Sequence, residues 1–262
     1  MGRYAFHHDG AADRLELLTE YARRLTGVTD DFWEHHILDA RLYRILADGA
    51  PVGWLTLAEG ARLTALDTAP AHRSRASGLL DAAIDALGIT CAWAPTCDEG
   101  LLALCLDRAR AVRPQAYLFD GATPPAVRPP EYPRALLRRI APGEMAEVNR
   151  LSDGFFANDA TEDSLRAGEQ EVYVLEDGGK ALGWGIIVPV RSRPGYMACG
   201  MVTREDMRRR GVGRSVQLHL GDICRERGQR PLSGCWWRNE ASRRTIESAG
   251  RYTTTTLVDI TF

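Results

Sequence analysis

A glycine- and arginine-rich stretch between an apolar run and a helix-forming run constrains this chain more than any other feature. The apolar run ends at Met201-Val202-Thr203, the stretch reads Arg208-Arg209-Arg210-Gly211-Val212-Gly213, and the helix-forming run covers residues 214–227. Glycines let the backbone approach a ligand, and the free N–H groups and positive dipole end of a helix start attract an anion. Arginines add fork-shaped donors that match phosphate oxygens. We therefore expect a strand–loop–helix site for a pyrophosphate, of the kind that an acyl-CoA carries.

On its own the stretch also fits an arginine-rich helix entry with a tight turn. A second motif favours the pyrophosphate interpretation, because a predicted strand at 232–237 is followed by Asn239, Ser242 and a helical run that ends at Gly250, just before Tyr252. In this order the two motifs resemble the GNAT superfamily of N-acyltransferases. Members of that family carry R/Q-x-x-G-x-G/A after their fourth strand, and N-x-x-A/S with a helix ending at Gly-aromatic after their fifth. The resemblance covers residues 133–262.

The composition limits the kinds of function that we expect of this chain. With 262 residues, of which 45% are hydrophobic and 26% charged, the chain is long enough for two domains with cores of their own. Its net charge of −2 argues against a general attraction to nucleic acid or to anionic membranes. The six cysteines form no C-x-x-C pair and no cluster with histidine, so no metal is expected. No signal-peptide core and no run of membrane-spanning length is visible, which favours a cytoplasmic protein.

A proline-rich segment divides the chain into two halves that resemble each other. Residues 121–133 hold five of the thirteen prolines, so we expect a linker at 123–133 between domains at 1–122 and 134–262. Residues 43–54 and 173–184 each read as an apolar strand, an Asp-Gly turn and a second strand with Gly-Trp. With the resemblance, this repeat predicts an α/β (α+β) fold of two GNAT-like domains, each a mixed, splayed β-sheet flanked by helices.

The second half has a clear pattern of elements. Apolar patterning and turn signals predict strands at 135–140, 171–176, 182–190, 196–203, 232–237 and 253–262, and helices at 142–155, 161–167, 212–227 and 240–249. The last strand is rich in β-branched residues. This order matches the GNAT fold, whose sheet splays open between its fourth and fifth strands.

Two departures from the family pattern indicate that the first half is degenerate. Arg75 and Gly78 match the loop motif, but Leu80 replaces its second glycine and puts a branched side chain where the backbone should meet the pyrophosphate. Asp98 stands where the second half has Asn239, and would place an anion beside an anionic ligand. We expect a structural or substrate-shaping role for this half. A second working site and a coincidental repeat both stay open.

The resemblance implies which residues of the second half bind the donor, acetyl-CoA or another acyl-CoA. Main-chain groups of Met201, Val202 and Thr203 would pair with the pantetheine amides. The phosphates and the adjoining parts of the donor would contact a larger set: Arg208, Arg209, Arg210, Gly211, Val212, Gly213, Arg214, Ser215, Asn239 and Ser242.

The acid and base of the reaction are not fixed by the pattern. The tyrosine that usually protonates the leaving thiolate is replaced by Ile246, so either the thiolate leaves unassisted or another residue serves. Tyr252 and Ser242 are candidate acids, although they can equally be a core aromatic and a helix contact. Glu205 and Tyr196 are candidate bases, and Glu205 can instead hold a neighbouring arginine.

Four aromatic residues are candidates for the acceptor pocket, although aromatic residues at such positions usually belong to a core: Phe155, Phe156, Trp184 and Trp236. The leading hypothesis is an N-acyltransferase that acts on a small-molecule amine such as an amino acid, an aminoglycoside-like compound or a peptide natural product. The strand and loop are similar to the glycine N-acyltransferase-like branch of the family. Alternatives are an acyl-CoA-binding sensor and a transferase with another anionic donor. We expect a monomer or homodimer with no nucleic-acid or membrane partner.

Overall fold

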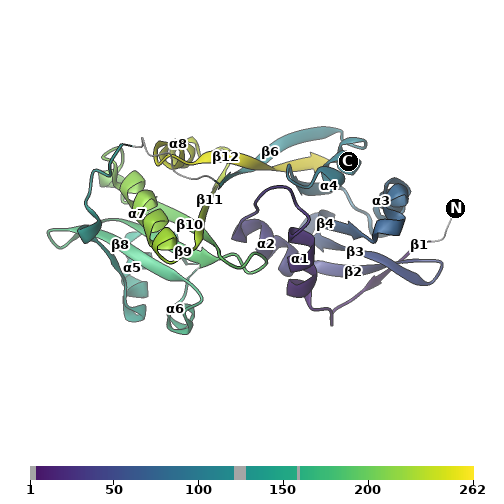
Figure 1. Ribbon diagram of the computed structural model, residues 1–262, viewed down its shortest axis with the longest axis horizontal. Coiled ribbons are helices and arrows are strands. Elements are labelled where there is room, and N and C mark those ends of the chain that lie inside the picture. The colour runs from purple at the N-terminus through teal and green to yellow at the C-terminus, as the bar shows by residue number, and fades with distance from the viewer. Residues whose placement is uncertain (1–3, 121–127, 158–159) are drawn as a thin grey trace. The chain divides into compact units, whose positions relative to one another are not determined.

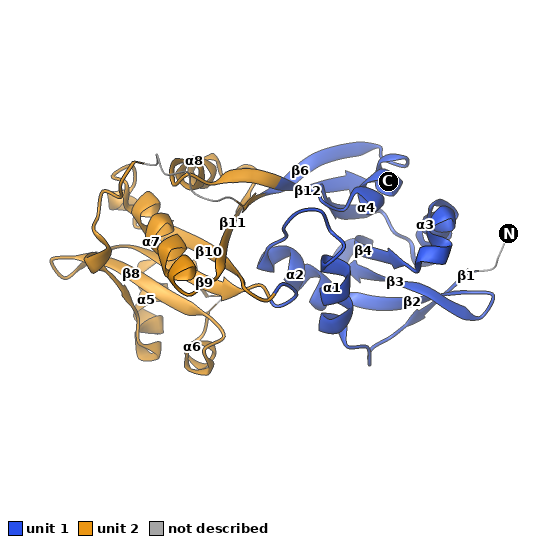
Figure 2. Ribbon diagram, in the orientation of Figure 1, with its two compact units in different colours: residues 1–117, 191–193, 255–262 blue, residues 118–190, 194–254 orange. Residues whose placement is uncertain are grey.

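The structure is a computed structural model that describes residues 4–120, 128–157 and 160–262 (Figure 1). The chain forms two compact units (Figure 2). Unit 1 comprises Met1–Tyr117, Arg191–Arg193 and Thr255–Phe262, and unit 2 comprises Leu118–Val190 and Pro194–Thr254. The predicted linker at 123–133 lies partly outside the described residues, since residues 121–127 are among those not described.

Unit 1 is built on an antiparallel meander that ends in a parallel pair. Its strands are β1 (Tyr4–His8), β2 (Arg41–Ala47), β3 (Ala50–Ala58), β4 (Arg62–Thr68) and β5 (Cys91–Pro95), followed by β6 (Ala111–Asp120). Its helices are α1 (Arg14–Ala22), α2 (Asp31–Leu38), α3 (Ala76–Leu87) and α4 (Glu99–Leu106). The predicted Asp-Gly turn joins β2 to β3, with Asp48 and Gly49 at φ of 50° and 85°. Strands β4 and β5 run parallel, because α3 connects them.

Unit 2 repeats this order. Its strands are β7 (Leu137–Arg139), β8 (Glu171–Asp177), β9 (Lys180–Pro189), β10 (Tyr196–Thr203) and β11 (Arg230–Trp236), and β12 (Tyr252–Thr261) ends the chain. Its helices are α5 (Met145–Leu151), α6 (Glu162–Ala167), α7 (Val212–Glu226) and α8 (Glu240–Ser248). The predicted helix at 142–155 is shorter, because Asp153 and Gly154 adopt φ of 56° and 69° and end it. The predicted strand at 135–140 is reduced to three residues after a 3₁₀ turn at Arg134–Leu136.

The last strand of the second half joins the sheet of the first half. The strand order is β1-β2-β3-β4-β5-β12-β6-β11-β10-β9-β8-β7. The C-terminal strand β12 pairs antiparallel with β5, from Leu257 opposite Pro95 to Thr261 opposite Cys91, and so completes the sheet of unit 1. Strand β6 lies between β12 and β11, and its last residues belong to unit 2. The compact units therefore differ from the contiguous division at 1–122 and 134–262, because each takes in strand residues from the other half of the sequence.

The β9–β10 connection also belongs to unit 1. The Glu34 carboxylate on α2 is fully buried and accepts hydrogen bonds from the backbone N–H groups of Arg191, at 3.0 Å, and Ser192, at 2.6 Å. The Arg193 side chain donates to the carbonyl oxygen of Ala22 at 2.5 Å. These charge-assisted bonds fix three residues of the connection on the helices of unit 1.

Two glycines on β9 let α7 pack closely on the sheet of unit 2. A Cβ atom on Gly183 would lie 2.7 Å from a methyl carbon of Val212, and one on Gly185 would lie 2.7 Å from methyl carbons of Val216 and Leu220. The helix therefore approaches β9 nearer than any side chain would allow. This seating fixes where the first turn of α7 lies relative to the end of β10.

Among the described residues, no helix is both long and apolar enough to cross a membrane.

The pairing of β12 with β5 makes a testable prediction about where a core deletion acts. Leu257 on β12 is fully buried in a cluster of unit 1 with Trp33 and Trp54, so Leu257→Ala should cost about 3 kcal/mol of stability there. Hydrogen exchange should show lost protection in β5 with β8 preserved. The matched variant Leu175→Ala, in the core of unit 2, should do the reverse. Loss of protection in β8 alone after Leu257→Ala would contradict the assignment of β12 to unit 1.

Candidate functional site

The parallel strands β10 and β11 separate half-way along their length. They pair from Tyr196 opposite Arg230 to Ala198 opposite Leu232, and the ladder ends there. On its other side β10 stays paired with β9 as far as Thr203 opposite Gly183. The second half of β10 is thus an edge facing an opening between two strands, as the predicted splay requires.

The hydrogen bonds of β10 show which backbone groups face this opening. Arg204 N–H donates to Leu182 O at 3.1 Å, so even-numbered residues direct their backbone groups toward β9. Arg230 N–H donates to Gly195 O at 2.8 Å, so odd-numbered residues direct theirs toward β11.

Of the three residues predicted to pair with a pantetheine, two are therefore oriented for it. Met201 and Thr203 lie beyond the end of the ladder and direct N–H and C=O groups into the opening. Val202 pairs with Trp184 of β9 and has its backbone groups directed that way. The edge offers an extended amide the alternating donors and acceptors of a missing strand.

The loop after β10 has the geometry of an anion site. A 3₁₀ turn at Glu205–Met207 is followed by Arg209 and Gly211 with φ of 61° and 78°, and α7 begins at Val212. No side chain of the described residues caps α7, so its first-turn N–H groups are free to bind a ligand. Arg208, Arg209 and Arg210 are exposed, and no hydrogen bond or ion pair of their side chains is found within the described part of the chain.

The second glycine of the motif is required by packing. A Cβ atom on Gly213 would lie 3.0 Å from Thr203 Oγ1 and 3.1 Å from Thr245 Cγ2. The first turn of α7 is therefore wedged between the end of β10 and α8. Gly213 lets the three elements meet at the opening.

Two predicted ligand residues, Arg214 and Ser215, are occupied by the segment Arg128–Pro133, which we call the strap. Arg214 is 6% exposed; its guanidinium donates to the Glu131 carboxylate at 2.9 and 3.1 Å and to the Arg128 carbonyl at 2.5 Å. Ser215 is fully buried, and its Oγ accepts from Tyr132 N–H at 3.1 Å. The strap is thereby fastened to the first turn of α7.

The first glycine of the motif leaves space for the strap. A Cβ atom on Gly211 would lie 2.3 Å from Glu131 Oε2, so only glycine admits the carboxylate. Sequence reasoning missed the strap, because its proline content indicated only a linker. The isolated Glu131 among prolines, with Arg214 in the next motif, is the signal that charge pairing could have used.

The motif asparagine is a helix cap. The Asn239 Oδ1 atom accepts from Ser242 N–H at 3.0 Å at the start of α8. Ile246, at the position of the usual tyrosine, is buried in the core. Tyr252, at the start of β12, is 57% exposed and is free to meet a ligand. Ser242 is half-buried beside the cap.

The two candidate bases lie apart. Tyr196 begins β10, roughly 23 Å of extended strand from Thr203, and its OH accepts from Arg230 at 3.2 Å. The structure therefore does not bring Tyr196 to the loop. Glu205 is exposed at the start of the 3₁₀ turn, and the ion pairs of this turn, to Lys180 and Arg204, are made by Asp206.

The aromatic candidates divide into two kinds. Phe156 and Trp184 are at most 1% exposed and belong to the core of unit 2 with Val172. Phe155 and Trp236 are 47% and 53% exposed, so only these two can contact an acceptor without rearrangement of the core.

The corresponding positions of unit 1 are filled by the protein itself. Leu80 is fully buried in the core. Asp98 caps α4 by accepting from Leu101 N–H at 3.1 Å, and also accepts from the Tyr21 hydroxyl. Burial raises the pKa of both Asp98 and Tyr21. Trp93 on β5 and Ala65 on β4 belong to one buried cluster, and both lie beyond the last paired residues of these two strands.

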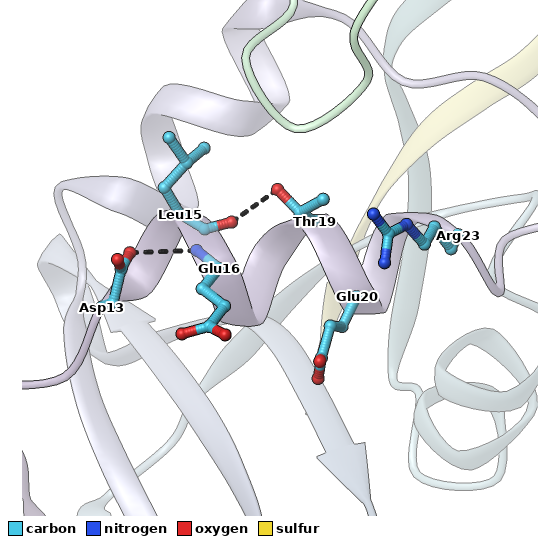
Figure 3. Close-up of a pocket in the computed structure, with 6 residues that line it drawn as sticks. All are labelled: Asp13, Leu15, Glu16, Thr19, Glu20 and Arg23. Carbon is cyan, nitrogen blue, oxygen red and sulfur yellow. Dashed lines mark hydrogen bonds between the residues drawn. The ribbon is translucent and has the colours of Figure 1, made fainter.

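A surface hollow lies along α1 in unit 1 (Figure 3). Its side chains bond locally, Thr19 Oγ1 to Leu15 O at 2.7 Å and Asp13 Oδ1 to Glu16 N–H at 3.0 Å. No group of histidine, cysteine or carboxylate residues suited to a metal occurs in the described residues.

Comparison with protein families places an acetyltransferase domain in each half. Residues 11–122 match an acetyltransferase (GNAT) domain model, and residues 138–250 match the model of the acetyltransferase (GNAT) family. A search of curated protein sequences returns no match.

Solved structures share the whole two-unit fold. A GNAT-family acetyltransferase from Colwellia psychrerythraea aligns with a TM-score of 0.83 at 16% identity, covering 99% of both chains. A tandem GNAT protein from the clavulanic acid biosynthesis pathway aligns with a TM-score of 0.63 at 16% identity, covering 99% of this chain and 98% of the other. At these identities the likeness concerns the fold, and it extends over both halves.

The strap makes a prediction about stability. Glu131→Gln removes the charge that pairs with the buried Arg214, and should lower the free energy of unfolding by about 2 kcal/mol. Glu147→Gln, which breaks an exposed pair with Arg150, should change it by less than about 0.5 kcal/mol. Denaturant titration of both variants measures the difference. Equal effects would show that the strap is not fastened by this pair.

His219 makes a prediction about pH. Its Nε2 lies 2.8 Å from Tyr132 O in the strap, and burial lowers the pKa of His219 below its usual 6.5. As the pH falls below 6.5, the unfolded chain binds the proton before the folded one, so folded stability decreases toward acid. The melting temperature should drop further between pH 7.5 and pH 5.5 in the wild type than in His219→Gln, which cannot titrate. Parallel curves would exclude His219 as the cause.

Proposed function

This chain belongs to the GNAT family of acetyltransferases, with one GNAT domain in each half, and we propose that unit 2 moves an acyl group, with acetyl as the leading candidate, from an acyl-CoA to the amine of a small molecule. The observation that carries the proposal is the free edge of β10 beside an uncapped, arginine-flanked first turn of α7. Both features lie at one end of unit 2. In unit 1 the motif positions differ, because Leu80 is buried in the core and Asp98 caps α4, so we propose one donor site per chain.

The residues fit the two chemical parts of such a donor. The N–H and C=O groups of Met201 and Thr203 would bind the amides of the arm, as an added strand does. The first-turn N–H groups of α7 and the three exposed arginines would bind the phosphates. When bound, the acyl-CoA supplies a thioester whose carbonyl carbon is attacked by the neutral amine, so that an amide forms and the thiolate leaves.

The chain's own residues would handle charge and protons. An N–H group on the edge of β10 would stabilise negative charge on the carbonyl oxygen. Tyr252 and Ser242 are the candidate donors of a proton to the thiolate, since Ile246 is buried and carries none. Glu205 is the candidate acceptor of the amine proton, because Tyr196 lies at the other end of β10.

The acceptor is proposed to be a small amine. Phe155 and Trp236 are the exposed aromatic residues available to contact it. The similarity of the strand and loop to the glycine N-acyltransferase-like branch supports amino acids. One neighbour in fold is a tandem GNAT protein from the clavulanic acid biosynthesis pathway, and for this reason natural-product amines belong in the same screen. We propose that the protein is a monomer or homodimer. We also propose that it has no nucleic-acid or membrane partner.

A sensor that binds an acyl-CoA without turnover is the second candidate, favoured by the buried Ile246 in place of a tyrosine. Release of thiol from acetyl-CoA in the presence of any amine of the screen separates the two. Turnover that depends on the amine establishes the transferase. Tight binding with no thiol release from any amine would favour the sensor.

The donor loop makes a prediction that does not need the acceptor. Arg208→Glu/Arg210→Glu should weaken acetyl-CoA binding about 100-fold, because two charge-assisted hydrogen bonds of about 1.5 kcal/mol or more are lost. Arg150→Glu on α5, exposed and remote from the loop in sequence, is the matched control and should bind as the wild type does. Calorimetry measures the affinities and should give about one site per chain. Equal binding by the loop variant would exclude the phosphate role of the loop.

A further inference from the structure

The register of β10 and β11 predicts a backbone hydrogen bond that is not made. Arg230 N–H donates to Gly195 O, and the strands pair in this register up to Ala198 opposite Leu232. Four residues further along each strand, the same register would bring Gly234 N–H to the carbonyl oxygen of Cys199. The ladder ends before this bond, so β11 leaves β10 at that point.

Two side chains take the place of the missing donor. Cys199 O accepts from Ser233 Oγ at 3.0 Å and from Gln217 Nε2 at 3.1 Å. Ser233 Oγ also lies 3.0 Å from Gln217 Oε1, so the three groups form one network. Gln217 and Ser233 are each 1% exposed and Cys199 is 2% exposed. We call Gln217 and Ser233 the pin.

The pin makes it unnecessary for β10 and β11 to stay paired beyond Ala198. A buried carbonyl oxygen without a partner costs free energy, and continued pairing with β11 would be the ordinary way to satisfy it. Because side chains satisfy Cys199 O, the sheet can stay open beyond it. The backbone groups of Met201 and Thr203 then remain available to a ligand.

Gln217 also connects the opening to the anion loop. It lies four residues after Gly213 on α7, hence on the same face of the helix and roughly 6 Å further along its axis. Gly213 contacts the end of β10, and Gln217 bonds to Cys199 in its middle. One helix thus sets the distance between the phosphate-binding turn and the point where the strands separate.

We propose that Gln217 and Ser233 are positioning residues that hold β10 and β11 apart and so fix the depth at which the arm of an acyl-CoA enters unit 2. The assignment rests on the proposed function. It predicts that changes to the pin weaken binding of the arm. Binding of the nucleotide half of the donor, which would take place at the loop, should not change.

The test compares two ligands on two variants. Gln217→Met keeps the length of the side chain without its amide, and Ser233→Ala removes one oxygen. Each should weaken acetyl-CoA binding about tenfold in calorimetry, while adenosine 3′-phosphate 5′-diphosphate, the nucleotide half without the arm, should bind as to the wild type. Ser233→Thr keeps the hydroxyl and should retain most of the acetyl-CoA affinity.

A buried polar pair elsewhere gives the matched control. Thr56 and Thr64 of unit 1 are buried and their hydroxyls lie 2.8 Å apart, so Thr64→Val should lower stability with both affinities unchanged. Pin variants that lose stability but bind acetyl-CoA like the wild type would overturn the proposal and leave a structural role only. A wild type that binds neither ligand would overturn the proposed function and the pin assignment together.

Discussion

The close seating of α7 on β9 is the constraint on which the site of unit 2 depends. It exists because Gly183 and Gly185 carry no side chains where Val212, Val216 and Leu220 pack. From this position the helix directs its first turn to the end of β10 and places an amide against the carbonyl of Cys199. The position of the anion loop and the opening between the strands therefore both depend on one packing arrangement.

The elements of the second half could be predicted well from local patterns. The strand predicted at 196–203 is β10, and the helix predicted at 212–227 is α7 within one residue. The partner of the last strand could not be predicted, because β-branched composition identifies a strand but not its neighbour. Pairing of β12 with β5 joins residues far apart in the sequence, and only the folded chain decides it.

The candidate site was predictable in outline and less so in its details. The loop, the exposed arginines and the edge of β10 stand where the motifs indicated them. Arg214 and Ser215 are engaged by the strap instead, and Val202 is directed toward β9. A motif gives the residues that surround a ligand but not the direction of each backbone group, since that direction depends on which neighbouring strand takes it.

The pairing of β12 with β5 bears on how the chain is made. The sheet of unit 1 is completed by β12, whose residues are the last ten before Phe262. During synthesis the edge of β5 therefore stays unpaired until β12 itself has been made. An open edge of this kind can pair with another chain, so a nascent copy is exposed to mispairing or to chaperone binding during the interval between the synthesis of β5 and that of β12.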